Sequence, residues 1–129
     1  SKALSLAVNN LTIRRNRVVG GDWNFAYSGS GDISDNEFRG ARSRGWQIVG
    51  TGQSVHAYRN RFIGGGVGIG VNASGPDGTV RLTDNTLSGY TVGVQRSDAV
   101  QVQSQGNSFW ANGQHAVGVT LDGSTRYTP

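Results

Sequence analysis

Apolar and polar residues alternate in many short runs along the chain, and one such run recurs five times. Strict alternation is typical of β-strands, because successive side chains of a strand point to opposite faces. Each copy has an Asn near its centre, with Val, Leu or Phe two positions after it. The copies that align without gaps are residues 11–20, 31–40, 55–64, 80–89 and 102–111.

The central Asn sets the period of the repeat. Its positions are Asn16, Asn36, Asn60, Asn85 and Asn107, which gives steps of 20, 24, 25 and 22 residues. A third alternating run follows each copy, as in Trp23–Tyr27 and Val67–Val71. A propeller blade needs about 40 residues, and the six-residue period of a left-handed coil is absent. The pattern predicts an all-β, single-stranded, right-handed parallel β-helix of about five to six turns, each of 20–25 residues. We expect residues 1–129 to form one domain, a segment of a longer rod.

Two columns of the repeat are expected to face the interior, three residues before the Asn and two residues after it. They comprise Ile13, Ile33, Ala57, Leu82 and Ser104, and Val18, Phe38, Phe62, Leu87 and Phe109. The Asn is expected to take the left-handed conformation of a tight turn, and the five stacked amides to form a hydrogen-bonded ladder. Arg15, Arg17, Arg59 and Arg61 flank these turns, and Asp35, Glu37 and Asp84 are expected to pair with them between coils.

The composition narrows the choice of partners. The formal net charge is +4, and eleven of the twelve basic residues are Arg, which allows contact with acidic polysaccharide or nucleic acid. Neither a recognition helix nor a basic stacking motif is evident, which argues against nucleic acid. The chain lacks an 18-residue apolar run, so a membrane span is not predicted. It also lacks Cys and Asp-rich nonapeptides, and neither a metal nor a cofactor is predicted.

With its turn-marking Asn column and its stack of aliphatic and Phe residues, the chain resembles the pectate-lyase-like right-handed β-helix superfamily over about residues 3 to 121. Members of that superfamily include pectate lyases, polygalacturonases, mannuronan epimerases and phage tailspikes. The resemblance implies an extracellular or cell-surface protein that acts on or binds polysaccharide, often a polyuronate. A shared fold alone does not establish function.

The resemblance also places reactive groups on the outer side of the third strand and its bordering loops. The outward positions of the third strand are expected to include Asn24, Gln47, Gly68, Gly70, Gly93 and Gln95. They predict a smooth, Gly-rich face without a pair of carboxylates. Arg pairs there are suited to clamp a uronate carboxylate, and aromatic rings to stack on sugars. The candidate substrate-binding residues are Arg42, Arg44, Gln47, Tyr90, Gln95, Arg96 and His115.

A second candidate site lies on the strand before the Asn. Its outward columns are Thr12, Asp32, His56, Arg81 and Gln103, and Arg14, Ser34, Tyr58, Thr83 and Gln105. Arg81 is suited to neutralise a uronate, and His56 or Tyr58 to move a proton, so these three are the candidate catalytic residues. The ordinary interpretation is a solvated surface on which Arg81 lies along the Tyr58 ring.

Three functions follow as hypotheses. The first is a carbohydrate-recognition or scaffold module that lies along an acidic polysaccharide. The second is a fragment of a polyuronate lyase or C5-epimerase. The third is a structural rod of a spike or adhesin, either trimeric or with flanking domains that cap its ends.

Overall fold

The computed structural model describes residues 2–49, 54–72, 79–96, 101–119, 121–122 and 125–127, and these residues form β-strands without any helix. The strands are β1 (Lys2–Arg14), β2 (Arg17–Val19), β3 (Trp23–Ser34), β4 (Glu37–Arg39), β5 (Arg44–Val49), β6 (Ser54–Tyr58), β7 (Arg61–Ile63), β8 (Val67–Asn72), β9 (Thr79–Thr83), β10 (Thr86–Ser88), β11 (Val92–Arg96), β12 (Gln101–Gln105), β13 (Ser108–Trp110), β14 (Gln114–Val117), β15 (Leu121–Asp122) and β16 (Thr125–Tyr127). Within the described residues, no helix is long and apolar enough to cross a bilayer.

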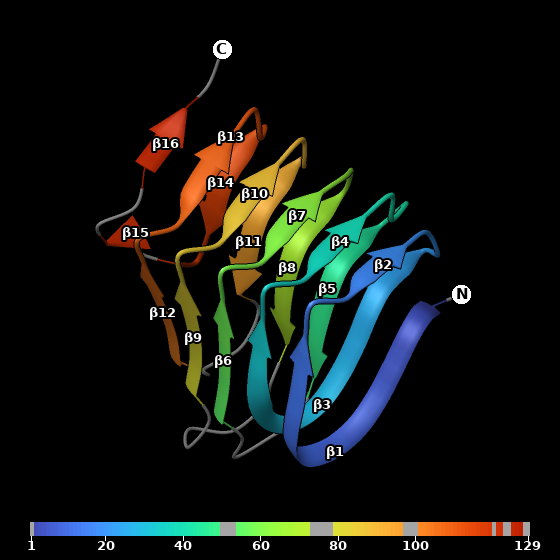
Figure 1. The fold of residues 1–129 in the computed structure, drawn as a ribbon. Coiled ribbons are helices and arrows are strands. Elements are labelled where there is room, and N and C mark those ends of the chain that lie inside the picture. The colour runs from blue at the N-terminus through green and yellow to red at the C-terminus, as the bar shows by residue number, and fades with distance from the viewer. Residues whose placement is uncertain are drawn as a thin grey trace.

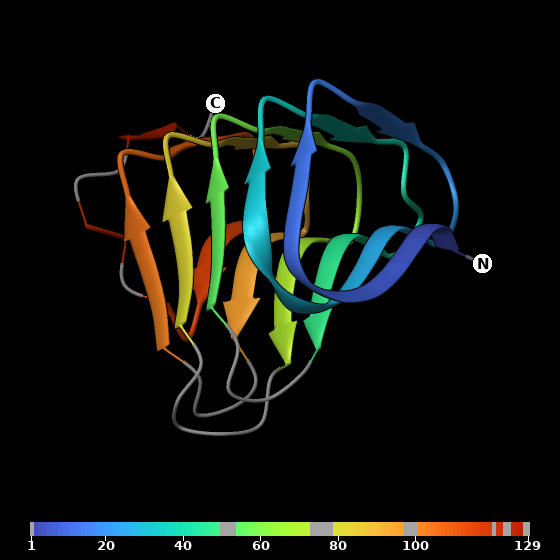
Figure 2. The same ribbon diagram turned by 60° about the horizontal axis from the view of Figure 1, so that its bottom comes forward.

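The strands wind into a right-handed parallel solenoid with three faces (Figures 1 and 2). Face 1 contains residues 11–14 of β1, residues 31–34 of β3, and β6, β9, β12 and β15. Face 2 is the sheet of β2, β4, β7, β10, β13 and β16. Face 3 contains the first parts of β1 and β3 together with β5, β8, β11 and β14. Faces 1 and 3 belong to one sheet because β1 and β3 run continuously around the corner between them.

The number of complete turns is about four, slightly fewer than the five to six predicted. The ladder positions from Asn16 to Asn107 are separated by four steps, and each step is one complete coil. The strands before Asn16 and after Asn107 add only partial coils at the two ends.

The two inward columns predicted from the repeat are confirmed. Phe38, Phe62, Leu87 and Phe109 are all buried, and so are Ile33, Ala57 and Leu82 of the other column. Rings from faces 2 and 3 meet in the first coils, where Phe38 lies 5.0 Å from Phe62 and 6.2 Å from Trp46 between ring centroids. Stacked rings of this kind add to the stabilisation that burial of their apolar area provides.

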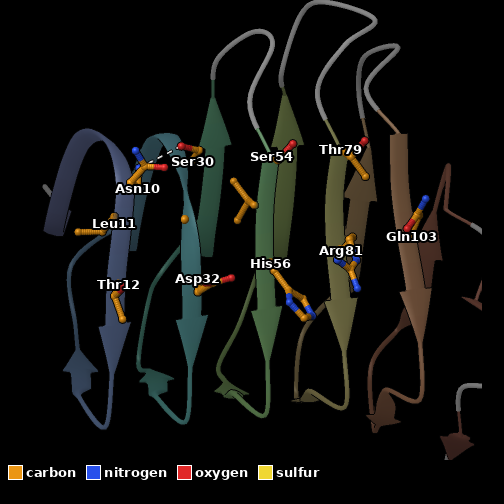
Figure 3. Close-up of a pocket in the computed structure, with 12 residues that line it drawn as sticks. Asn10, Leu11, Thr12, Ser30, Asp32, Ser54, His56, Thr79, Arg81 and Gln103 are labelled. Carbon is orange, nitrogen blue, oxygen red and sulfur yellow. Dashed lines mark hydrogen bonds between the residues drawn. The ribbon is translucent and has the colours of Figure 1, made fainter.

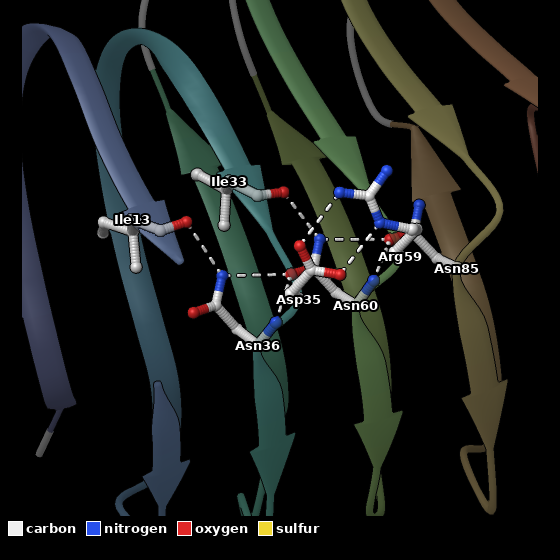
Figure 4. Close-up of polar contacts among 7 residues, drawn as sticks. All are labelled: Ile13, Ile33, Asp35, Asn36, Arg59, Asn60 and Asn85. Atoms are coloured by element: carbon white, nitrogen blue, oxygen red, sulfur yellow. Dashed lines mark hydrogen bonds and ion pairs between the residues drawn. The ribbon is translucent and has the colours of Figure 1, made fainter. Parts of the chain in front are cut away.

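The Asn column forms a hydrogen-bonded ladder (Figure 4). The backbone N–H and side-chain amide of Asn60 both donate to Oδ1 of Asn85, at 2.9 and 3.1 Å. The Asn60 amide also donates to the carbonyl oxygen of Ile33 in the preceding coil, at 2.8 Å. Asn36 and Asn85 repeat this pattern one coil away. Each amide therefore joins three successive coils.

The left-handed residue of each turn is the one before the Asn, which corrects the conformation expected for the Asn itself. Arg15, Asp35, Arg59 and Asp84 have φ between 55° and 59°, and Gly106 has φ of 69°. Because the residue before it makes the sharp turn, the Asn side chain is directed into the coil, where its amide reaches the neighbouring turns.

The glycines of face 3 do not form the smooth outer surface that was expected. A Cβ at Gly68 would lie 3.0 Å from Tyr90 and 3.1 Å from Leu87, and one at Gly93 would lie 3.1 Å from Phe109. These glycines therefore face the core and make room for its side chains. Asn24 is also buried, and its amide donates to the carbonyl oxygens of Gly20 and Arg39.

Candidate functional site

An open groove of about 1030 Å³ lies on face 1 and crosses β1, β3, β6, β9 and β12 (Figure 3). The groove follows the solenoid axis, because each strand contributes residues from the same part of the repeat. Its lining residues are Asn10, Leu11, Thr12, Ser30, Gly31, Asp32, Ser54, Val55, His56, Thr79, Arg81 and Gln103.

Five polar or charged residues of the groove stand in one row across the strands. Strand register pairs Thr12 with Asp32, Asp32 with His56, His56 with Arg81, and Arg81 with Gln103. Stacked strands are about 4.8 Å apart. The row thus presents one polar or charged side chain at each step along the axis, as the outward column of the repeat predicts.

His56 occupies the centre of the row. Its Nε2 lies 3.2 Å from Oγ1 of Thr83, and its ring lies 4.5 Å from the Tyr58 ring between centroids. Partial burial lowers the pKa of His56 below its ordinary value of 6.5, and the neighbouring positive charge of Arg81 lowers it further, whereas Asp32 opposes the shift. The neutral form of the imidazole is therefore the major one at pH 7.

We expect an NMR titration to place the pKa of His56 below 6.5, because both burial and Arg81 disfavour the imidazolium. Arg81→Gln should raise this pKa, and Asp32→Asn should lower it further. The imidazole of His56 binds a proton more readily in the unfolded chain than in the folded one. The contribution of neutral His56 to stability is therefore present above pH 6.5 and is lost as the pH falls through the pKa of the folded state. An Arg81→Gln variant that leaves the titration unchanged would contradict the arrangement of these side chains.

Tyr58 is held by Arg59, not by Arg81 as expected. The Arg59 guanidinium carbon lies 4.7 Å from the centroid of the Tyr58 ring. Arg59 is fixed in turn by two hydrogen bonds of 2.9 Å to Asp35, one to each carboxylate oxygen (Figure 4). These bonds lower the pKa of Asp35 below its ordinary value. His56 and Arg59 therefore both restrict the Tyr58 ring, and Arg81 is left to face the groove.

The structure does not bring the candidate substrate-binding residues of face 3 together into one site. Tyr90 is 2% exposed and packs in the core, so its ring is not available to stack on a sugar; burial also raises the pKa of its hydroxyl. Gln47 is 4% exposed and lies with Arg44 over Gly70. Tyr90 and Gln47 are therefore buried within the protein, and Arg44 is half-buried beside Gln47.

The other residues of that set lie apart from one another. Arg42 is exposed before β5 and forms an ion pair of 3.4 Å with Asp22. Gln95 is half-buried and Arg96 is exposed on β11. His115, on β14, is half-buried with its ring 5.8 Å from that of Phe109. The described part of the chain holds no group of three or more His, Cys, Asp or Glu residues suited to bind a metal ion.

Comparison of the chain with models of protein families, with curated proteins and with solved structures found no match. The fold and its repeat place the chain in the class of parallel β-solenoids.

Proposed function

We propose that this chain is a polysaccharide-binding solenoid and that an extended acidic polysaccharide lies along the groove of face 1. The observation that carries the proposal is the row from Thr12 to Gln103, which presents hydrogen-bonding groups at a regular spacing along the axis. A polymer with a regular repeat can contact several coils at once, so that weak contacts add together.

Arg81 favours an anionic group at this part of face 1. Its side chain is exposed, and among the residues that line the groove it is the one Arg and Asp32 is the one carboxylate. The guanidinium of Arg81 is suited to a bidentate contact with a carboxylate. The half-buried rings of His56 and Tyr58 offer apolar surface beside it for a sugar ring. Glycoside hydrolysis normally uses two carboxylates, so the single Asp32 favours binding over hydrolysis.

Calorimetric titration with polygalacturonate and with alginate tests this proposal. We expect binding that weakens as salt rises, because screening reduces the attraction between Arg81 and a carboxylate. Arg81→Ala should weaken binding about tenfold or more, as expected for the loss of a charge-assisted hydrogen bond. Arg61→Ala is the matched control, since it removes an exposed Arg from face 2. No heat with either polymer, or equal losses in the two variants, would refute binding in this groove.

Cleavage of a polyuronate is the second candidate, because His56 lies beside both Arg81 and the Tyr58 ring and its lowered pKa favours the neutral imidazole. A neutral imidazole is able to accept a proton at the sugar C5 while Arg81 neutralises the carboxylate. Ultraviolet absorbance of unsaturated uronate would detect elimination, and proton NMR would detect C5 epimerisation. Either product, lost in His56→Ala, would favour the enzyme; binding without product favours the recognition module.

Membership of the pectate-lyase-like superfamily is part of this proposal, and it is supported by the parallel coils, the Asn ladder and the Phe stack. With it we propose an extracellular or cell-surface location, where acidic polysaccharides are found.

A further inference from the structure

The N-terminal end of the solenoid leaves two strands with an unpaired edge. Strand β1 pairs with β3, and β2 pairs with β4, but neither has a neighbour on its other side among the described strands. Strand β1 extends over 13 residues. A long exposed edge of this kind is a template for pairing with a further strand, and proteins usually cover or interrupt it.

The core is also open at this end. A hollow of about 490 Å³ is lined by Ala3, Leu4, Ile13, Asn16, Arg17, Val18 and Val19. Val18 is only half-buried, whereas Phe38, the next member of its core column, is completely buried. The apolar columns thus continue to the surface and end there without a covering residue in the described part of the chain.

The Asn ladder is incomplete at the same place. The Oδ1 atoms of Asn36, Asn60, Asn85 and Asn107 accept the backbone N–H of the Asn one coil before. Asn16 has no preceding ladder residue, and its side chain is exposed. Its amide donates to the carbonyl oxygen of Arg14 in its own coil, at 3.0 Å, whereas the amide of Asn36 donates to the carbonyl oxygen of Ile13 in the preceding coil.

The residues on either side of the first three ladder Asn residues alternate in charge along the rod. They read Arg15 and Arg17, then Asp35 and Glu37, then Arg59 and Arg61, and Asp84 follows in the next coil. Ion pairs join these coils: Arg59 to Asp35 at 2.9 Å, and Arg17 to Glu37 at 3.7 Å. By the same alternation, the coil that covers Arg15 and Arg17 should carry acidic residues.

We propose that the N-terminal end of the solenoid is an interface for one further parallel coil, supplied by a flanking solenoid segment and carrying an Asn between two acidic residues. That Asn donates its backbone N–H to Oδ1 of Asn16, and the acidic side chains pair with Arg15 and Arg17. The strands of this coil extend the sheets at β1 and β2 and cover Leu4, Ile13 and Val18.

A second copy of this chain fits the interface less well. Head-to-head contact would bring Arg15 and Arg17 against their own counterparts. In head-to-tail contact the C-terminal coil would meet this end, but the chain contains no Asn after Asn112 to continue the ladder. Moreover, Arg126 holds the register position that follows Phe109, so a charged residue would continue the apolar column toward Val18.

The chain itself contains a suitable probe, because residues 21–40 form a coil with Asp35, Asn36 and Glu37 in the required order. A second copy of residues 21–40 fused before Ser1 should raise the midpoint of thermal unfolding by about 5 °C or more. It should also slow hydrogen exchange at least about tenfold for the amides of β1 that point away from β3. Asp35→Lys together with Glu37→Lys, made in the fused copy alone, should abolish most of the rise in the midpoint and most of the slowing of exchange. Asn36→Ala in the fused copy should reduce both changes.

Exchange at the amides of β6, β7, β9 and β10 serves as the internal control, because these strands are paired on both sides in every variant. Unchanged unfolding and unchanged exchange in β1 on fusion of the native copy would overturn the interface. An equal gain from the Lys-substituted copy would overturn the requirement for acidic residues. Neither outcome bears on the groove of face 1, which these variants leave intact.

Discussion

Phe62→Ala is expected to lower the free energy of unfolding by about 3–5 kcal/mol, the usual cost of truncating a buried Phe. Phe62 is completely buried, and it stacks on Phe38 and Trp46 with ring centroids 5.0 and 6.0 Å away. In strand register it also stands between Phe38 and Leu87. Removal of the ring leaves a cavity that the neighbouring coils cannot fill without shifting, and urea denaturation measures the loss.

Arg61→Ala is the matched control, because Arg61 is exposed on the opposite side of the same strand. Its effect should be about half a kcal/mol or less, as is usual at surface sites. A shift of one residue in register would exchange the two faces of β7 and reverse this contrast. A larger loss for Arg61→Ala than for Phe62→Ala would therefore contradict the fold.

Asn60→Ala should produce the second large loss, of about 2–6 kcal/mol. The substitution leaves two buried groups without partners, the backbone N–H of Asn36 and the carbonyl oxygen of Ile33. An unpaired buried polar group costs about 1–3 kcal/mol, and water has little access to replace these bonds. Thermal or urea unfolding of the purified variant checks the magnitude.

Asn16→Ala provides the comparison at the exposed end of the same ladder. The Asn16 amide donates only to the carbonyl oxygen of Arg14 in its own coil, where water is able to substitute. The expected loss is about 1 kcal/mol or less. Similar losses at Asn60 and Asn16 would show that the ladder contributes through local turn geometry, without the bonds between coils.

The sequence was sufficient to predict the parallel coil and its interior because the repeat carries two independent signals. Alternation of residues identifies which side of each strand is buried, and the fixed position of the Asn aligns the coils. Phe38, Phe62 and Leu87 therefore appear in the core as expected. The pairing of Arg59 with Asp35 follows from the same alignment.

The candidate sites were predicted less well, because they depend on how the chain turns from one face of the coil to the next and on contacts between coils. On β3, Asn24 and Phe25 are consecutive and both completely buried, so alternation fails at that corner. Gly68 and Gly93 also depart from the alternation, because they face the core where outward residues were expected. The burial of Tyr90 depends on the space that these glycines leave, which no pattern within a single coil reveals. The outward row of face 1 was recognisable, but the groove above it was not.

Most of the difference in repeat length falls at one corner of the coil. In the first coils β1 and β3 pass from face 3 to face 1 without a break, whereas later strands end at Val49, Asn72 and Arg96 and resume at Ser54, Thr79 and Gln101. Tyr27 and Gly31 are four positions apart, whereas their register partners in the later coils are seven, nine and six positions apart, which accounts for most of the added length. Evolution is thus able to lengthen or shorten the chain there without moving a core column or a ladder Asn. Because Ser54 and Thr79 also line the groove, sequence drift at this corner can alter what the groove accepts while the rod stays the same.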